Sequence, residues 1–173
     1  SIGGVGKTTI AKAVYNLIAD QFESCIFLAN VRERSKQKLG LVQLQEALLY
    51  EVLGRDNVKL GTTDRGINVI KSRLQNKRVL LVLDDVDQTE QLEALAGGPH
   101  WFGSGSRIIF TTRDDHLLVS HGVQYTYKVK ELSYVDSLQL FSWHAFRNPC
   151  PQKGYKEFIS FVLNYAKGLP LAL

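Results

Sequence analysis

The stretch Gly3-Gly4-Val5-Gly6-Lys7-Thr8-Thr9 decides the fold of this chain of 173 residues. Glycines let a backbone turn so tightly that several N–H groups point into one concavity, and such a concavity binds phosphate oxygens. A helix that starts directly after the loop adds the positive end of its dipole. The stretch follows the P-loop pattern G-x-x-x-x-G-K-[ST], except that Ser1 stands at the position of the first glycine.

The pattern assigns a role to each side chain at the end of the loop. Lys7 is expected to contact the β- and γ-phosphates, and the Thr8 hydroxyl is expected to ligate Mg²⁺. Thr9 can hydrogen-bond further along the phosphate chain. A glycine-rich turn that merely precedes a helix is the structural alternative.

Apolar spacing along the chain predicts alternating helices and strands. Helical spacing predicts helices over these segments: Thr8–Asp20, Leu41–Val52, Ile67–Leu74 and Gln88–Ala96. Apolar runs predict strands over these: Cys25–Ala29, Val79–Leu83, Arg107–Thr111 and Tyr125–Val129. The polar, basic stretch Arg32–Lys38 is expected to be a loop. Strands separated by helices indicate an α/β fold with a doubly wound, mostly parallel sheet.

The pattern changes near Leu132. Two helical stripes follow, Leu138/Phe141/Ala145 and Phe158/Phe161/Val162/Tyr165, with the helix breakers Asn148-Pro149-Cys150-Pro151 between them. We therefore expect residues 1–131 to form a P-loop nucleotide-binding α/β domain and residues 132–173 to begin an all-helical domain. The chain has no methionine and begins inside the loop, so we expect a fragment whose first strand is missing.

Acidic residues end the most apolar of the expected strands. Leu80-Leu81-Val82-Leu83 is followed by Asp84 and Asp85, which places two carboxylates at the sheet edge where ligands bind in such folds. Asp84 is expected to hold Mg²⁺. Asp85 is expected to orient an attacking water or to accept its proton. An acidic surface turn is the structural alternative.

Arg113 lies just past another expected strand, at the same edge. A guanidinium there can sense a γ-phosphate, and a solvated arginine is the alternative. Asn76-Lys77 begins the guanine-specifying motif Asn-Lys-x-Asp, but Val79 stands at the acidic position, which argues against GTP. Trp101, Trp143 and the phenylalanines are expected in the core.

Composition and charge narrow the functional classes. The net charge of +4 is compatible with an anionic ligand but does not predict nucleic acid binding, and Arg32–Lys38 lacks the interleaved aromatic residues of such a surface. No apolar run approaches the length of a membrane span. Two cysteines do not suggest a disulfide framework and favour a reducing compartment. The four histidines have no metal-ligand spacing, so Mg²⁺ is the one metal expected.

Four motifs in this order resemble the NB-ARC domain of plant NB-LRR disease-resistance proteins. They are the glycine-rich loop at 3–9, Leu-Val-Leu-Asp-Asp-Val-Asp at 81–87, Gly-Ser-Arg-Ile-Ile-Phe-Thr-Thr-Arg at 105–113 and Gly-Leu-Pro-Leu-Ala-Leu at 168–173. Asp87 stands where the other large subclass usually has tryptophan. Together with Phe27-Leu-Ala-Asn-Val-Arg-Glu33, it resembles the TIR-bearing subclass.

The resemblance implies a function. It implies an ADP/ATP-binding switch of a plant intracellular immune receptor in the defence response, off with ADP and on with ATP, and reset by slow ATP hydrolysis in the full-length protein. It implies that Arg113 reads the γ-phosphate and that Pro170 approaches the nucleotide. The implied partners are TIR and leucine-rich-repeat domains, with self-association as a further option. The implied compartment is the cytoplasm, with the nucleus as the alternative.

Two other functional classes remain open. One is a different P-loop ATPase of the same superfamily, a motor or a regulatory ATPase, which would need an arginine finger from a neighbouring subunit. The other is an interaction module with a dead nucleotide site. The intact set Lys7, Thr8, Asp84 and Asp85 argues against the second class.

Overall fold

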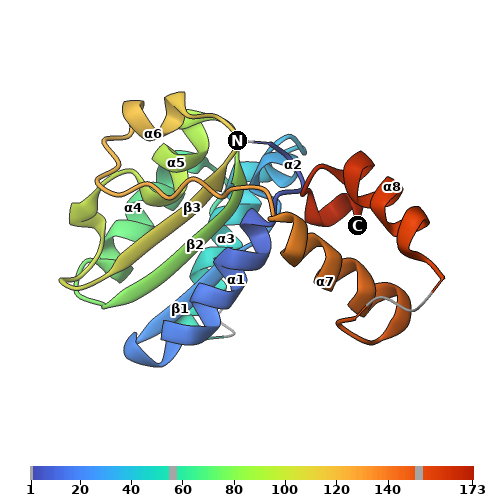
Figure 1. Cartoon of the computed structure of the whole chain (residues 1–173). Helices are drawn as coiled ribbons and strands as arrows, with labels where there is room; N and C mark the ends of the chain where they lie inside the picture. Colours follow the sequence, from blue (N-terminus) through green and yellow to red (C-terminus); the bar gives the residue numbers. More distant parts are fainter. Residues whose placement is uncertain (1, 55–57, 151–153) are drawn as a thin grey trace. The chain divides into compact units, whose positions relative to one another are not determined.

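The protein is represented by a computed structural model that describes residues 2–54, 58–150 and 154–173 (Figure 1). Backbone contacts divide the chain into two compact units. One unit is Thr8–Thr126, and the other combines the residues before Thr8 with Tyr127–Leu173. The chain thus divides after Thr126, whereas the sequence pattern placed the boundary at residue 132. Ser1 and Pro151, which the sequence patterns single out, lie outside the described residues.

The first unit is built on a parallel sheet. Its strands are β1 (Ser24–Leu28), β2 (Val79–Val86) and β3 (Arg107–Thr112), in the order β1-β2-β3. Both pairings are parallel, with Ile26 opposite Leu81 and Leu81 opposite Ile108. All three carboxyl ends therefore lie at one edge of the sheet.

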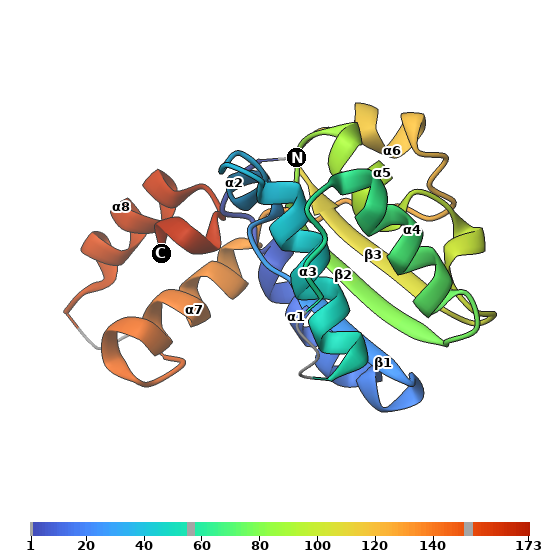
Figure 2. The same ribbon diagram turned by 180° about the vertical axis from the view of Figure 1, so that it is seen from behind.

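Helices precede, separate and follow the strands. They are α1 (Lys7–Ile18), α2 (Val31–Ser35), α3 (Gly40–Leu53), α4 (Thr63–Leu74), α5 (Thr89–Ala96) and α6 (His116–Ser120), with 3₁₀ turns at Ala19–Gln21 and Pro99–Trp101. Figures 1 and 2 show α1 on one face of the sheet and α3, α4 and α5 on the other. This arrangement confirms the predicted α/β class with a parallel sheet.

The central strand is apolar because both of its faces are covered. Val79, Leu81 and Leu83 enter a cluster with residues of α3, α4 and α5, whereas Leu80 and Val82 pack with Ala11 of α1. Full burial of each such side chain stabilises the fold by about 1.5–3 kcal/mol relative to exposure. The continuous apolar run thus encodes a strand between two helical layers.

The second unit is helical. Helix α7 (Tyr134–Phe146) is capped by Ser133, whose hydroxyl accepts a hydrogen bond from the Asp136 N–H at 3.1 Å. Helix α8 (Lys156–Ala166) ends at Lys167 in the left-handed region, and a 3₁₀ turn (Pro170–Ala172) follows. The two predicted helical stripes lie within these two helices.

The structure corrects two secondary-structure predictions. Tyr125–Val129 is not a strand, and Tyr125 and Tyr127 are 90% and 80% exposed. A strand needs a hydrogen-bonded neighbour as well as an apolar pattern. The segment Arg32–Lys38 is also not simply a loop, because Val31–Ser35 form α2. Val31 is fully buried and anchors this helix.

The prediction of aromatic core residues holds only in part. Trp101 is buried. In contrast, Trp143 is 52% exposed, Phe158 is 60% exposed and Phe161 is 71% exposed. Helical spacing creates an apolar face, whereas burial also requires a second element packed against that face.

No helix within the described ranges combines the length and apolar character needed to cross a bilayer.

Candidate functional site

The glycine-rich loop has the backbone of a phosphate cradle. Gly4 and Gly6 have φ values of +81° and +97°, a region that side chains with a Cβ strongly disfavour. Helix α1 begins at Lys7, directly after the loop. Val5, between these two glycines, is buried. Loop N–H groups ahead of a helix N-terminus fit an anionic phosphate.

The loop also lies beside the segment Gly168-Leu169-Pro170-Leu171 of the same unit. The Leu171 N–H donates to the Gly4 carbonyl at 3.3 Å. A Cβ placed on Gly6 would lie 4.0 Å from Pro170 Cγ, and one on Gly4 would lie 3.0 Å from Leu171 Cβ. The structure therefore places Pro170 next to the backbone that is expected to surround the phosphates.

Two residues at the end of the loop have different surroundings. The Lys7 ammonium group donates to the Ile2 carbonyl at 2.8 Å, within the same unit. Thr9 is exposed on the first turn of α1. Gly3 is half-buried at the start of the turn.

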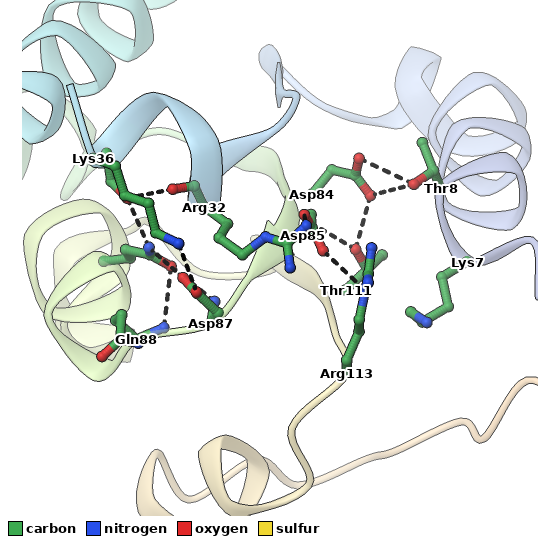
Figure 3. Close-up of polar contacts among 12 residues, drawn as sticks. Lys7, Thr8, Arg32, Lys36, Asp84, Asp85, Asp87, Gln88, Thr111 and Arg113 are labelled. Carbon is green, nitrogen blue, oxygen red and sulfur yellow. Dashed lines mark hydrogen bonds and ion pairs between the residues drawn. The ribbon is translucent and has the colours of Figure 1, made fainter. Parts of the chain in front are cut away.

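Asp84 is a buried carboxylate that lies between two threonine hydroxyls (Figure 3). The Thr8 hydroxyl lies 2.9 and 3.1 Å from the two carboxylate oxygens of Asp84. From β3, the Thr111 hydroxyl donates to Asp84 Oδ1 at 2.7 Å. Asp84 is 2% exposed, so its charge depends on these donors. A hydroxyl and a carboxylate are oxygen ligands that fit Mg²⁺, which commonly keeps several waters beside one or two protein ligands.

Asp85 faces a different set of groups. It lies at a register shift between β2 and β3, with a φ of +59° in the left-handed region. Its N–H donates to Thr111 Oγ1 at 2.9 Å. Its carboxylate pairs with Arg32 at 2.9 Å and with Arg113 at 3.5 Å. Asp85 and Arg113, which were predicted separately as site residues, are thus in contact, and Arg32 and Thr111 also contact Asp85.

Asp87 fixes the helix that carries Arg32. The Gln91 side-chain amide donates to Asp87 Oδ1 and to Ser35 Oγ, each at 2.8 Å, and Gln91 Oε1 accepts from the Asp87 N–H at 2.9 Å. Lys36 approaches Asp87 at 3.9 Å. Because Gln91 is buried, this network ties α2 to the end of β2 and to the first turn of α5.

A pocket of about 270 Å³ opens at this edge of the sheet. Its lining consists of Arg32, Asp85, Val86, Asp87, Arg113 and Asp114. Two guanidinium groups and three carboxylates therefore face one space. Such a lining can hold water and a polar ligand group rather than an apolar one.

Sequence reasoning missed Arg32, Thr111 and Gln91. Arg32 lies within the stretch Phe27–Glu33, which indicated only a family subclass. Thr111 is part of the motif that ends at Arg113, and its place beside Asp84 follows from strand pairing. No local signal distinguishes Gln91 from any other polar residue in the first turn of a helix.

Two groups outside this cluster have shifted pKa values. Burial raises the pKa of the Cys25 thiol, and the charge of Asp20 adds to the effect. The thiol donates to the Ala19 carbonyl at 3.1 Å. Burial also raises the pKa of Tyr15, with smaller contributions from Cys25 and Glu51. Both groups stay protonated at neutral pH and take no part in the carboxylate cluster.

Comparisons with known proteins agree on one family. The family model described as the NB-ARC domain matches residues 1–150. The chain is similar to the disease resistance protein RPV1 of Vitis rotundifolia, with 42% identity over 99% of this chain and 12% of the relative. It is 44% identical to the TMV resistance protein N of Nicotiana glutinosa, over 99% of this chain and 15% of the relative. The chain thus spans only a small part of the length of these relatives.

Proposed function

The chain belongs to the NB-ARC family of P-loop nucleotide-binding domains, and on that premise we propose that it is the adenine-nucleotide switch of a plant intracellular immune receptor. It binds ADP or ATP together with Mg²⁺, is off with ADP and on with ATP, and is reset by slow hydrolysis of ATP. The disease-resistance relatives, which align with nearly the whole chain, support the role in defence.

The contact between Thr8 and Asp84 carries the proposal. The hydroxyl at the start of α1 lies within 3.1 Å of both oxygens of a buried carboxylate at the end of β2. These are the two protein ligands that a P-loop site offers to Mg²⁺. When bound, Mg²⁺ neutralises phosphate charge. The protein's part is to hold Thr8 and Asp84 together before the ion arrives.

The other site residues act on the phosphates and on water. The backbone of residues 3–6 and the side chains of Lys7 and Thr9 bind the phosphates. Asp85 orients the attacking water, and Arg113 senses the γ-phosphate. The contact of 3.5 Å between Arg113 and Asp85 supports this assignment, because a γ-phosphate would compete with Asp85 for the same guanidinium.

Adenine is favoured over guanine by the sequence at the base of β2. Val79 stands where a guanine-specifying motif needs an acidic residue, and it is fully buried in the core. Val79 is also the first residue of β2, at the opposite end of the strand from Asp84 and Asp85, so this segment neither completes the guanine motif nor reaches the ligand edge. We extend the proposal to TIR and leucine-rich-repeat domains as partners, to self-association, and to a cytoplasmic or nuclear site of action.

Calorimetric titration of the purified full-length protein with ADP tests the proposal. Lys7→Ala removes the positive charge assigned to the β-phosphate, so ADP binding should fall below detection. Lys12→Ala is the matched control, because Lys12 is exposed on the same helix. GDP is the control for the base and should bind more weakly than ADP.

Three results bear against the proposal. A wild-type protein that binds no adenine nucleotide would favour an interaction module with a dead site. Equal affinity for ADP and GDP would contradict the choice of base. Unchanged ADP affinity in Lys7→Ala would contradict the phosphate role of the loop.

A further inference from the structure

Two guanidinium groups hold one carboxylate at the end of β2, and they hold different oxygens. Arg32 Nη2 lies 2.9 Å from Asp85 Oδ2, and Arg113 Nε lies 3.5 Å from Asp85 Oδ1. The side chain of Arg32 is 35% exposed and that of Arg113 is 50% exposed. Arg32 is therefore the closer and more enclosed partner, and the loss of either contact leaves the other in place.

Asp85 needs such a partner because the sheet does not hold it. The register between β2 and β3 shifts between Leu83 and Val86, so Asp85 lies outside the regular ladder. Its φ of +59° is a conformation that non-glycine residues seldom adopt. The Thr111 hydroxyl holds its backbone N–H at 2.9 Å, and the guanidinium of Arg32 holds its side chain.

Arg32 is itself presented from a fixed base. The hydroxyl of Ser35 donates to the Arg32 carbonyl at 3.0 Å and accepts from the buried Gln91 amide at 2.8 Å. Val31, the preceding residue in the chain, is fully buried. Helix α2 is thus anchored on both sides of Arg32, and this arginine is not a freely moving surface side chain.

We propose that Arg32 is a positioning residue that keeps Asp85 in place when Arg113 turns to the γ-phosphate. This inference rests on the nucleotide switch proposed above. Without a γ-phosphate, Arg113 occupies Asp85 Oδ1. When Arg113 leaves, Oδ1 becomes free to accept a hydrogen bond from the attacking water, while Arg32 still holds Oδ2 and balances its charge.

The adjacent pocket has room for that water. Its volume of about 270 Å³ far exceeds the roughly 10–15 Å³ that a cavity needs in order to hold one water molecule. Arg32, Asp85 and Arg113 all line it. Arg32 therefore acts on hydrolysis through Asp85, and nucleotide binding, which is assigned to the loop and to Asp84, does not depend on it.

Single-turnover hydrolysis of ATP by the purified full-length protein tests the role, together with Kd values for ADP and ATP. Arg32→Gln should slow hydrolysis about tenfold or more, as expected when a charge-assisted hydrogen bond is lost, with both Kd values nearly unchanged. Arg32→Lys should recover part of the rate because it keeps a positive charge. Arg34→Gln, on the same helix and without a role in the cluster, should behave as the wild type.

A double-mutant cycle separates positioning from a structural effect. In an Asp85→Asn background, Arg32→Gln should slow hydrolysis little further, because both changes act through one carboxylate. If Arg32→Gln fails to fold, the same cycle with Arg32→Lys decides.

The proposal is overturned by a wild-type hydrolysis rate in Arg32→Gln, by a full additional loss in the Asp85→Asn background, or by equal losses of binding and turnover. A wild-type protein that binds no adenine nucleotide would instead overturn the proposed function, so the two failures are distinguishable.

Discussion

Replacing Thr111 with valine should destabilise the α/β unit by about 2–3 kcal/mol. The substitution keeps the size and β-branching of the side chain, so it suits strand β3. What it removes is one hydroxyl that bridges two functional residues. That hydroxyl donates to Asp84 Oδ1 at 2.7 Å and accepts from the Asp85 N–H at 2.9 Å.

The magnitude follows from the burial of the two partners. Asp84 is 2% exposed, so water cannot replace the lost donor. A hydrogen bond to a charged group contributes about 1.5–3 kcal/mol, and an unsatisfied backbone N–H adds about 1 kcal/mol when it is buried. Because the Asp85 site is partly open, that second contribution is reduced. The Thr8 hydroxyl remains as a donor to Asp84, which limits the total.

Guanidinium unfolding followed by tryptophan fluorescence measures this loss without nucleotide. The chain has two tryptophans, and the buried Trp101 reports on the α/β unit, whereas Trp143 is half-exposed in the helical unit. Thr111→Ser is the matched control. It keeps the hydroxyl and should recover most of the stability.

The reasoning is refuted if Thr111→Val unfolds within about 0.5 kcal/mol of the wild type, the range of an ordinary surface substitution. It is also refuted if Thr111→Ser is as destabilised as Thr111→Val. In that case the methyl group, and not the hydroxyl bridge, would carry the stability.

Three further predictions concern single groups. Asp85→Asn should slow ATP hydrolysis about 100-fold with little change in ATP affinity. Asp84→Ala should instead weaken ATP binding, and only when Mg²⁺ is present. Equal losses of binding and turnover in both variants would contradict the division of roles. Pro170→Leu should raise the ADP off-rate while hydrogen exchange of the glycine-rich loop stays as in the wild type, and an unchanged off-rate would reduce this segment to a structural turn. Because burial raises the pKa of the Cys25 thiol, its thiolate fraction at pH 8 is small. Iodoacetamide should therefore alkylate Cys25 more slowly than the exposed Cys150. Equal alkylation rates at pH 8 would contradict the burial of Cys25.

Much of the fold was predictable because it depends on local patterns. The period of 3.6 residues predicted α1, α3 and α4, and the continuous apolar run predicted the central strand β2. The glycine-rich loop is equally local, since only glycine readily adopts the φ values seen at Gly4 and Gly6. Asp84 and Asp85 could be placed at the ligand edge because they follow a buried parallel strand.

Tertiary structure decided the segments whose pattern permits more than one outcome. Tyr125–Val129 has the composition of a strand, but strand formation requires a hydrogen-bonded neighbour, which composition cannot reveal. Val31–Ser35 looks like the start of a basic loop, yet it forms a short helix that is docked by the buried Val31 and by the contacts of Arg32 and Ser35 with Asp85 and Gln91. These outcomes depend on which other parts of the chain lie nearby.

The site shows the same division between local and long-range information. The sequence by itself indicates which residues are candidates to bind phosphate and Mg²⁺, because Lys7 and Thr8 follow the P-loop pattern and Asp84 ends an apolar strand. Only the tertiary structure brought Arg32 and Thr111 to the two carboxylates, from α2 and β3. The physical reason is that a hydrogen bond or ion pair acts over about 3 Å in space, whereas its two partners here lie far apart along the chain. Strand register and helix docking bring them together, and no local spacing encodes either.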